Sequence, residues 1–125
     1  MIRLGAQALD LIHACAEGRL ADCRVNWAED HALTVVMAAE GYPGSHAKGS
    51  QIRGLEELPE DASHMVFHAG TAARDGSIVA SGGRVLNVTA RGESLREAHE
   101  KAYAMVDAID WPGGFCRRDI GWRAL

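Results

Sequence analysis

Two glycine-rich segments contain the residues best suited to bind an anion. One runs from Gly41 to Gly49 and includes Lys48, and the other is Ser81-Gly82-Gly83-Arg84. Glycine lets backbone N–H groups approach an anion closely, and the arginine fork matches the oxygens of a phosphate. The Gly-x4-Gly-Lys-Ser/Thr spacing of a P-loop is absent from both. Each segment also has an alternative without a ligand. The first could be a plain turn, and the second could be a bulged turn with a surface arginine.

Histidines and cysteines supply weaker candidates. His64 and His68 have the same strand parity and could place two metal ligands on one face, although two are too few for a structural zinc site. Cys116 stands beside Arg117 and Arg118, which could lower the pKa of its thiol. No partner base is apparent, so an inert cysteine is the alternative. The residues alone show no nucleophile–base pair and no paired carboxylates.

Composition excludes several classes of protein. The 125 residues are 47% hydrophobic and 24% charged, with a net charge of −4 and mixed signs, which argues against non-specific nucleic-acid binding. The longest apolar stretches fall far short of the roughly 20 residues that cross a bilayer, and no signal peptide is visible. Three scattered cysteines suit free thiols in a reducing compartment. We therefore predict one cytoplasmic domain with no membrane span and no nucleic-acid partner.

Two helices are predicted from apolar residues at helical spacing. The first runs from about Leu4 to Glu17 and ends at Gly18, a left-handed cap. The second begins at Ser94, which forms a capping box with Glu97, and ends before Pro112. The apolar stripe of the first helix is Leu4, Ala8, Leu11, Ile12 and Cys15, and that of the second is Leu95, Ala98, Ala102, Met105, Val106 and Ile109.

Short β-branched runs between turn residues predict an antiparallel sheet. An Asp75-Gly76 turn predicts a hairpin, and Ile52 with Leu55 predicts a short edge strand before an acidic loop from Glu56 to Asp61. The last long strand alternates, so we expect it to be half-buried. The predicted strands are residues 32–39, 65–69, 78–80 and 84–90. Strands of this kind between two helices indicate an α+β fold.

Four segments together resemble the phosphoribosylamine–glycine ligase family, also called glycinamide ribonucleotide synthetases. They occur in the order and spacing of that family, and the end of the first helix, Ala16-Glu17-Gly18-Arg19-Leu20, is also similar to it. The four segments are Val36–Gly44 with Lys48-Gly49, Val66–Thr71, Gly82–Leu86 with Val88, and Phe115–Ala124.

The resemblance implies a fold and a reaction. Residues 1–20 would be the final helix of an ATP-grasp core, and residues 21–125 the C-terminal domain of an ATP-grasp ligase of the rudiment-hybrid type, a small antiparallel sheet flanked by helices. The family activates glycine with ATP as an acyl phosphate, which the amine of 5-phosphoribosylamine attacks, in de novo purine biosynthesis (the IMP pathway). Its cofactors are ATP and Mg²⁺ or Mn²⁺.

The sequence departs from the family in what it lacks. The family's metal-binding stretch, Glu-x-Asn-x-Arg-Phe-Gly-Asp-Pro-Glu, does not occur here, and neither do its N-terminal substrate domain and ATP lid. We therefore expect the chain alone to bind neither ATP nor metal and to be inactive without these missing domains. A smaller departure is His46, where the family loop more often has tyrosine.

Resemblance to related ATP-grasp enzymes also implies a substrate site, because their C-terminal domains supply basic residues to a sugar phosphate. The corresponding residues here are Arg84 with Gly82 and Gly83, and secondly Lys48. The alternative is an orphaned, non-catalytic module that binds a phosphorylated sugar or a partner protein. In that case its own sheet or a dimer partner must bury the apolar stripe of the first helix.

Overall fold

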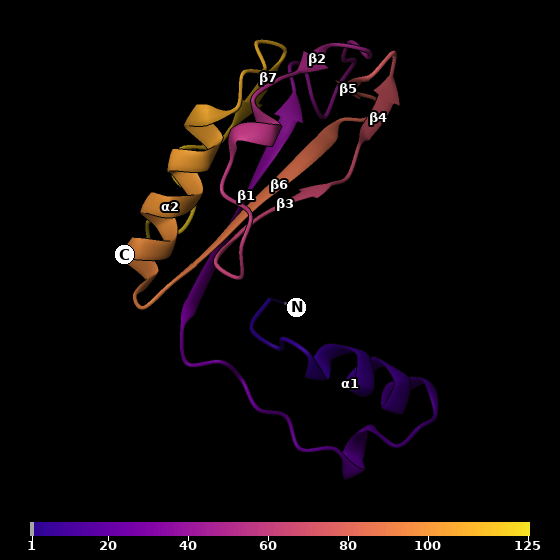
Figure 1. The fold of residues 1–125 in the computed structure, drawn as a ribbon, viewed down its shortest axis with the longest axis vertical. Helices are drawn as coiled ribbons and strands as arrows, with labels where there is room; N and C mark the ends of the chain where they lie inside the picture. Colours follow the sequence, from indigo (N-terminus) through magenta and orange to yellow (C-terminus); the bar gives the residue numbers. More distant parts are fainter. Residues whose placement is uncertain (1) are drawn as a thin grey trace.

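Two antiparallel sheets and two α-helices make up residues 2–125, which the computed structural model describes (Figure 1). The predicted α+β class is confirmed. No helix in this range is both long enough and apolar enough to span a membrane. The elements are α1 (Gln7–Ala16), η1 (Leu20–Asp22), β1 (His31–Ala39), β2 (Gln51–Ile52), η2 (Leu55–Glu57), β3 (His64–His68), β4 (Thr71–Arg74), β5 (Ser77–Ala80), β6 (Arg84–Gly92), α2 (Leu95–Ala108) and β7 (Gly114–Cys116).

The large sheet has the strand order β3-β6-β1-β7 and carries the core of the domain. Its two long strands, β1 and β6, pair apolar residues across the ladder, such as Val35 with Val88 and Leu33 with Ala90. Helix α2 covers one face of this sheet (Figure 1). Its buried stripe of Ala98, Ala102, Met105 and Val106 packs there, as predicted, because these residues recur every three or four positions.

Strand β6 is more buried than the alternating pattern predicts. Val88 and Ala90 are fully buried on the face under α2, but Val85 and Thr89 on the alternate positions are 0% and 3% exposed. Val85 joins the core because a β-bulge opposite Met37 and Ala38 shifts the alternation, while Arg84 and Asn87 stay exposed or half-buried, so the prediction of a half-buried strand holds in part. The buried Thr89 hydroxyl has a partner, since it hydrogen-bonds the hydroxyl of Thr34 at 2.9 Å.

Helix α2 begins at the predicted cap. The Ser94 hydroxyl accepts a hydrogen bond from the Glu97 N–H at 3.2 Å, while the Glu97 carboxylate accepts one from the Glu93 N–H at 2.7 Å. Near its middle, the Tyr103 hydroxyl donates to the Arg117 carbonyl at 2.7 Å and accepts from the Ile120 N–H at 3.2 Å. The Tyr103 hydroxyl therefore links residues 117–120 of the C-terminal segment to helix α2.

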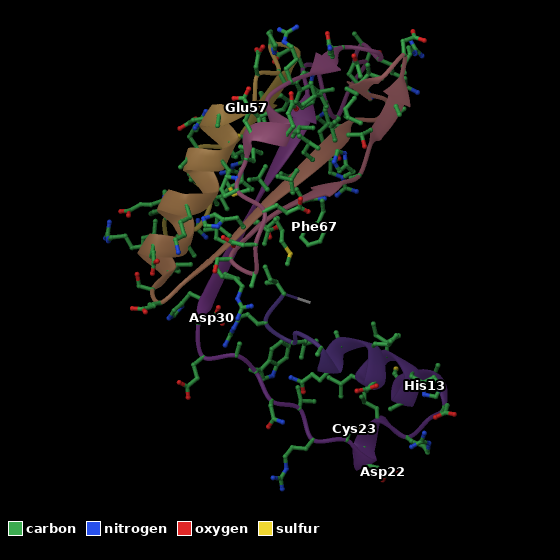
Figure 2. All side chains as sticks on the ribbon, viewed as in Figure 1. His13, Asp22, Cys23, Asp30, Glu57 and Phe67 are labelled. Carbon is green, nitrogen blue, oxygen red and sulfur yellow. The ribbon has the colours of Figure 1, made fainter. Side chains whose placement is uncertain are left out.

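Helix α1 lies apart from both sheets and packs on η1 (Figures 1 and 2). It begins at Gln7 rather than near Leu4, because residues 2–6 form turns. It ends at Ala16, and Gly18, whose φ is 71°, caps it as predicted in a Schellman motif, in which the Arg19 N–H donates to the Ala14 carbonyl at 2.8 Å. Ile12, in the apolar stripe, is 55% exposed, so the sheets of this chain do not bury that stripe.

The small sheet has the order β2-β5-β4 and includes the predicted Asp75-Gly76 hairpin. Leu55 is not part of its edge strand, contrary to prediction, because Gly54 has a φ of 78° and turns the chain into η2. The chain leaves the large sheet at Gly70 and returns at Gly82. There the N–H groups of Ser81 and Gly82 donate to the Gly70 carbonyl at 2.7 and 3.1 Å.

Strand β7 was not predicted. It pairs with β1 at the edge of the large sheet, where Gly114 lies opposite Ala39 and Cys116 opposite Met37. The indole of Trp111 is buried just before it and donates to the Ser50 hydroxyl at 2.9 Å.

Candidate functional site

Within residues 2–125, no helix packs against the face of the large sheet opposite α2. Cross-strand partners share a face, so the pairing of Ala38 with Arg84 on β6 and with Phe115 on β7 places all three there. The side chains of Phe67 and Phe115 are 49% and 40% exposed (Figure 2 labels Phe67). This open face consists of Thr34, Val36, Ala38, Phe67, Arg84, Asn87 and Phe115.

Two adjoining grooves lie on the open face and share Val36, Tyr42 and Arg84. The first groove has a volume of about 650 Å³ and the second about 270 Å³. The remaining residues that line the first are Ala69, Gly70, Gly83 and Asn87, and those that line the second are Thr34, Ala38, Phe115, Arg117 and Ile120. Arg84 therefore stands between the two grooves.

The structure brings the two glycine-rich segments of the sequence together. The loop after β1 folds over the start of β6, and the Ala39 N–H donates to the Gly83 carbonyl at 2.8 Å. A Cβ atom at Gly83 would lie 2.4 Å from Cδ2 of Tyr42 and 3.2 Å from Cε1 of His46. Only glycine at this position allows the loop to lie so close. His46 stays in place through its ring Nδ1, which lies 3.0 Å from the Gly44 carbonyl.

The predicted site residues do not all reach the grooves. Arg84 is exposed and has no ion-pair partner within residues 2–125. Gly83 lines the first groove, and its N–H has no backbone acceptor in the described part of the chain. The Gly82 N–H already donates to Gly70. Lys48 is exposed and lines neither groove, because the Gly49 N–H donates to the Ala80 carbonyl and turns the loop towards the small sheet. Lys48 therefore remains a prediction.

Sequence reasoning missed Arg117 as a groove residue. Its Nε and Nη2 donate to the two carboxylate oxygens of Asp119 at 2.8 and 2.5 Å. These hydrogen bonds lower the pKa of Asp119, so the carboxylate stays ionised at neutral pH. The signal was the position of Arg117 directly after residues 114–116, which are recognisable as a strand only through their pairing with β1.

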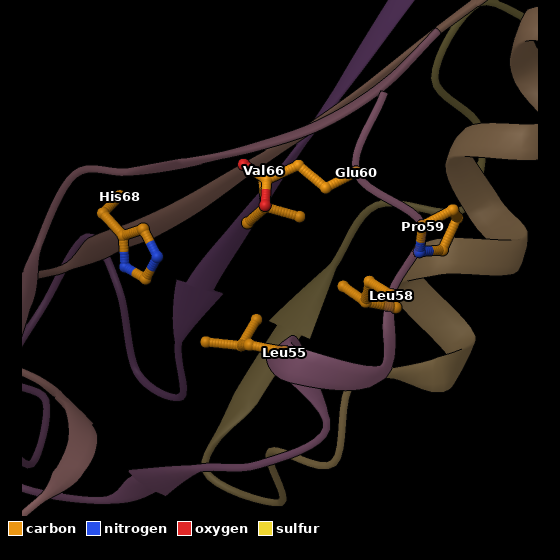
Figure 3. Close-up of a pocket in the computed structure, with 6 residues that line it drawn as sticks. All are labelled: Leu55, Leu58, Pro59, Glu60, Val66 and His68. Carbon is orange, nitrogen blue, oxygen red and sulfur yellow. The ribbon is translucent and has the colours of Figure 1, made fainter. Parts of the chain in front are cut away.

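The two histidines that were candidate metal ligands have separate partners. The Nδ1 of His64 lies 3.0 Å from a carboxylate oxygen of Asp61, and the Nδ1 of His68 lies 3.0 Å from the Thr71 hydroxyl. No group of three or more His, Cys, Asp or Glu residues within positions 2–125 could hold a metal ion. Beside His68 is a cavity of about 100 Å³ (Figure 3), lined also by Leu55, Leu58, Pro59, Glu60 and Val66.

All three cysteines are free, and burial raises the pKa of the Cys116 thiol more than Arg118 lowers it. This favours the inert alternative over the acidified thiol. We expect iodoacetamide at pH 7.5 to alkylate Cys116 at least about tenfold more slowly than the exposed Cys15, because the thiolate is the reacting form. Peptide mass spectrometry over time would measure both rates. Equal rates would show that the Cys116 thiol is as accessible and as reactive as that of Cys15. A Cys116→Ser variant serves as the control that identifies the Cys116 peptide.

A family model, curated relatives and a solved structure all match this chain to one family. The family described as "Phosphoribosylglycinamide synthetase, C domain" matches residues 32–123. The phosphoribosylamine–glycine ligase of Mesorhizobium japonicum is 54% identical over all 125 residues, which cover 29% of that relative. The chloroplastic ligase of Arabidopsis thaliana is 51% identical over the whole chain and 24% of its own length.

A solved structure supports the same assignment. The crystal structure of phosphoribosylamine–glycine ligase from Thermotoga maritima matches with a TM-score of 0.70 and 33% identity, over 90% of this chain and 28% of that one. The chain thus spans less than a third of the length of these relatives. The family model covers most of its residues, including both glycine-rich segments and the open face. The chain therefore belongs to the phosphoribosylglycinamide synthetase family and corresponds to its C domain.

Proposed function

We propose that this chain is the C-terminal portion of a phosphoribosylamine–glycine ligase, which in complete form joins glycine to 5-phosphoribosylamine with ATP in purine biosynthesis. The observation that carries the proposal is the first groove, where Arg84 and the Gly83 N–H, neither of which has a partner among the described residues, meet on the open face. Relatives about half identical over the whole chain are named for this reaction.

In this proposal the chain binds the sugar phosphate and shields it from water. The guanidinium of Arg84, which lines both grooves, donates two parallel hydrogen bonds to phosphate oxygens, and the Gly83 N–H is available to the sugar in the first groove. The half-buried amide of Asn87 lies in the same groove and is available to a sugar hydroxyl. Val36 and Tyr42 supply apolar walls, which reduce the local dielectric and strengthen these contacts.

The described residues of this chain do not fit the metal ion of the reaction. Mg²⁺ and Mn²⁺ require several oxygen ligands, and positions 2–125 contain no cluster of acidic or histidine side chains that could supply them. We therefore place ATP and the metal on the part of the ligase outside this chain. ATP supplies the phosphoryl group that activates the glycine carboxylate. The free thiols support a cytoplasmic location for the enzyme.

We also propose that residues 1–20 are the last helix of the ATP-grasp core and that residues 21–125 are the C-terminal domain. Helix α1 lies apart from the sheets, and Leu9 and Ile12 on it are 74% and 55% exposed. The family match begins only at residue 32. An independent module would bury these apolar side chains itself, so their exposure favours a chain that works with the other ligase domains over the orphaned module.

A chimeric ligase tests the proposed function. This chain would replace the corresponding 29% of the Mesorhizobium japonicum relative, and ADP release would be measured with glycine and 5-phosphoribosylamine. We expect turnover that requires both substrates, and growth of a purine auxotroph that lacks its own ligase. The relative truncated before this segment is the control and should be inactive. An inactive but folded chimera would contradict the proposal, as would ATP-dependent ligation by the 125-residue chain alone.

A further inference from the structure

Arg84 and Arg117 line the second groove from opposite sides. Ala38 on the central strand β1 pairs with Arg84 on β6 and with Phe115 on β7, and Arg117 directly follows the end of β7 and lines the same groove as Phe115. Strands that are two places apart in a sheet are separated by about 10 Å. Two long side chains across that distance can therefore approach one small anion from both sides.

The floor between the two arginines leaves room for such an anion. Ala38 has the smallest side chain that a non-glycine residue can place there, and the groove above it has a volume of about 270 Å³. Arg84 is exposed and has no carboxylate partner among residues 2–125, so no internal ion pair competes with a ligand for its guanidinium. A phosphate monoester carries roughly −1.5 to −2 charges at neutral pH, so one guanidinium does not neutralise it.

Arg117 is held in place before any ligand binds. Asp119 takes its Nε and one Nη2 hydrogen, and a guanidinium has five N–H donors, so three remain for a ligand. The Arg117 carbonyl accepts the Tyr103 hydroxyl at 2.7 Å, which fixes the backbone as well. The next residue, Arg118, differs because its guanidinium pairs with Asp107 on α2 and lines neither groove.

We infer that Arg117 is a second phosphate-binding residue, which together with Arg84 holds the phosphate of the phosphorylated sugar above Ala38, and that Asp119 positions it. The inference rests on the proposed function and extends it to a residue and a groove. Arg117 and Asp119 form a bidentate pair, so the cost of ordering the guanidinium falls before the substrate arrives.

The test uses Arg117→Ala in the chimeric ligase, with Arg118→Ala as the matched control. We expect the KM for 5-phosphoribosylamine to rise at least about tenfold in Arg117→Ala, because a charge-assisted hydrogen bond is lost. The KM values for ATP and glycine should stay within about twofold. Asp119→Asn should give a smaller rise in the same direction. An Arg117→Ala variant that matches Arg118→Ala, or that raises all three KM values alike, would overturn the inference.

A second measurement separates this inference from the ligase proposal and from a folding defect. Broadening of the ³¹P signal of ribose 5-phosphate would be followed with the 125-residue chain, whose melting temperature is measured in parallel. We expect broadening with the unchanged chain and with Arg118→Ala, and its loss with Arg84→Ala and with Arg117→Ala at unchanged melting temperature. An inactive chimera with this binding pattern would refute the ligase proposal alone. Equal binding by all four proteins, or by none, would refute the role of Arg117.

Discussion

Arg84→Ala in the complete ligase is expected to raise the KM for 5-phosphoribosylamine by roughly 10- to 100-fold while leaving the KM for ATP nearly unchanged. Arg84 is the cation shared by both grooves and has no carboxylate partner within the described residues. Its removal therefore takes away a bidentate contact with the phosphate and breaks no internal ion pair. Steady-state kinetics with each substrate varied in turn would measure the effect.

The kinetic pattern separates a binding role from a general loss of structure. Arg96→Ala is the matched control, since Arg96 is an exposed arginine on α2. It should leave all three KM values close to those of the unchanged enzyme. Lys48→Ala belongs in the same series, because Lys48 was predicted from the sequence but lies outside both grooves. Equal increases in the KM for ATP and for 5-phosphoribosylamine after Arg84→Ala would remove Arg84 from the phosphate site.

Gly114→Ala is expected to destabilise the chain by about 3 kcal/mol or more, the upper range for an overpacked core. A Cβ atom at Gly114 would lie 2.0 Å from Cε3 and 2.4 Å from Cζ3 of Trp111. The indole cannot move aside easily, because it is only 5% exposed and its Nε1 donates to the Ser50 hydroxyl. Urea denaturation followed by circular dichroism would give the change in the free energy of unfolding.

A second glycine provides the comparison for that measurement. The nearest atom to a Cβ at Gly44 would be the Gly41 carbonyl oxygen at 3.2 Å, on an exposed loop. Gly44→Ala should therefore cost clearly less than Gly114→Ala, within about 1 kcal/mol. If the two substitutions cost the same, Trp111 repacks without penalty, and the closeness of β7 to the core does not limit stability.

Local patterns in the sequence predicted the long elements well. Strands β1 and β6 and helix α2 follow from alternating or helical apolar spacing, and the Ser94 cap follows from its side chain. The features that local patterns did not predict depend on pairing between residues far apart in the chain. Strand β7 spans only three residues and exists because β1 offers it an edge, and the division into two sheets depends on partners far apart in the chain.

The residues of the candidate site also fall into those that local sequence predicts and those that depend on long-range pairing. Arg84 and Gly83 could be singled out because glycines before an arginine at the start of a strand form a local motif. Arg117 could not, since its place opposite Arg84 depends on the register of β7 against β1. Lys48 was predicted from the composition of its loop, whereas the direction of that loop is set by the hydrogen bond between Gly49 and Ala80.

The β4–β5 hairpin leaves the large sheet through a close backbone crossing at Gly70 and Gly82, and its strand β5 also pairs with β2. A Cβ atom at Gly70 would lie 2.6 Å from the Arg84 carbonyl oxygen and 2.9 Å from the Gly82 Cα atom. Extra residues at the exposed hairpin tip near Asp75 would be absorbed locally, since exposed loop tips tolerate insertions. Bulk at the crossing itself would instead displace the backbone of Arg84. The fold therefore accommodates added residues at the hairpin tip, but it requires small residues at the two glycines that join the hairpin to the large sheet.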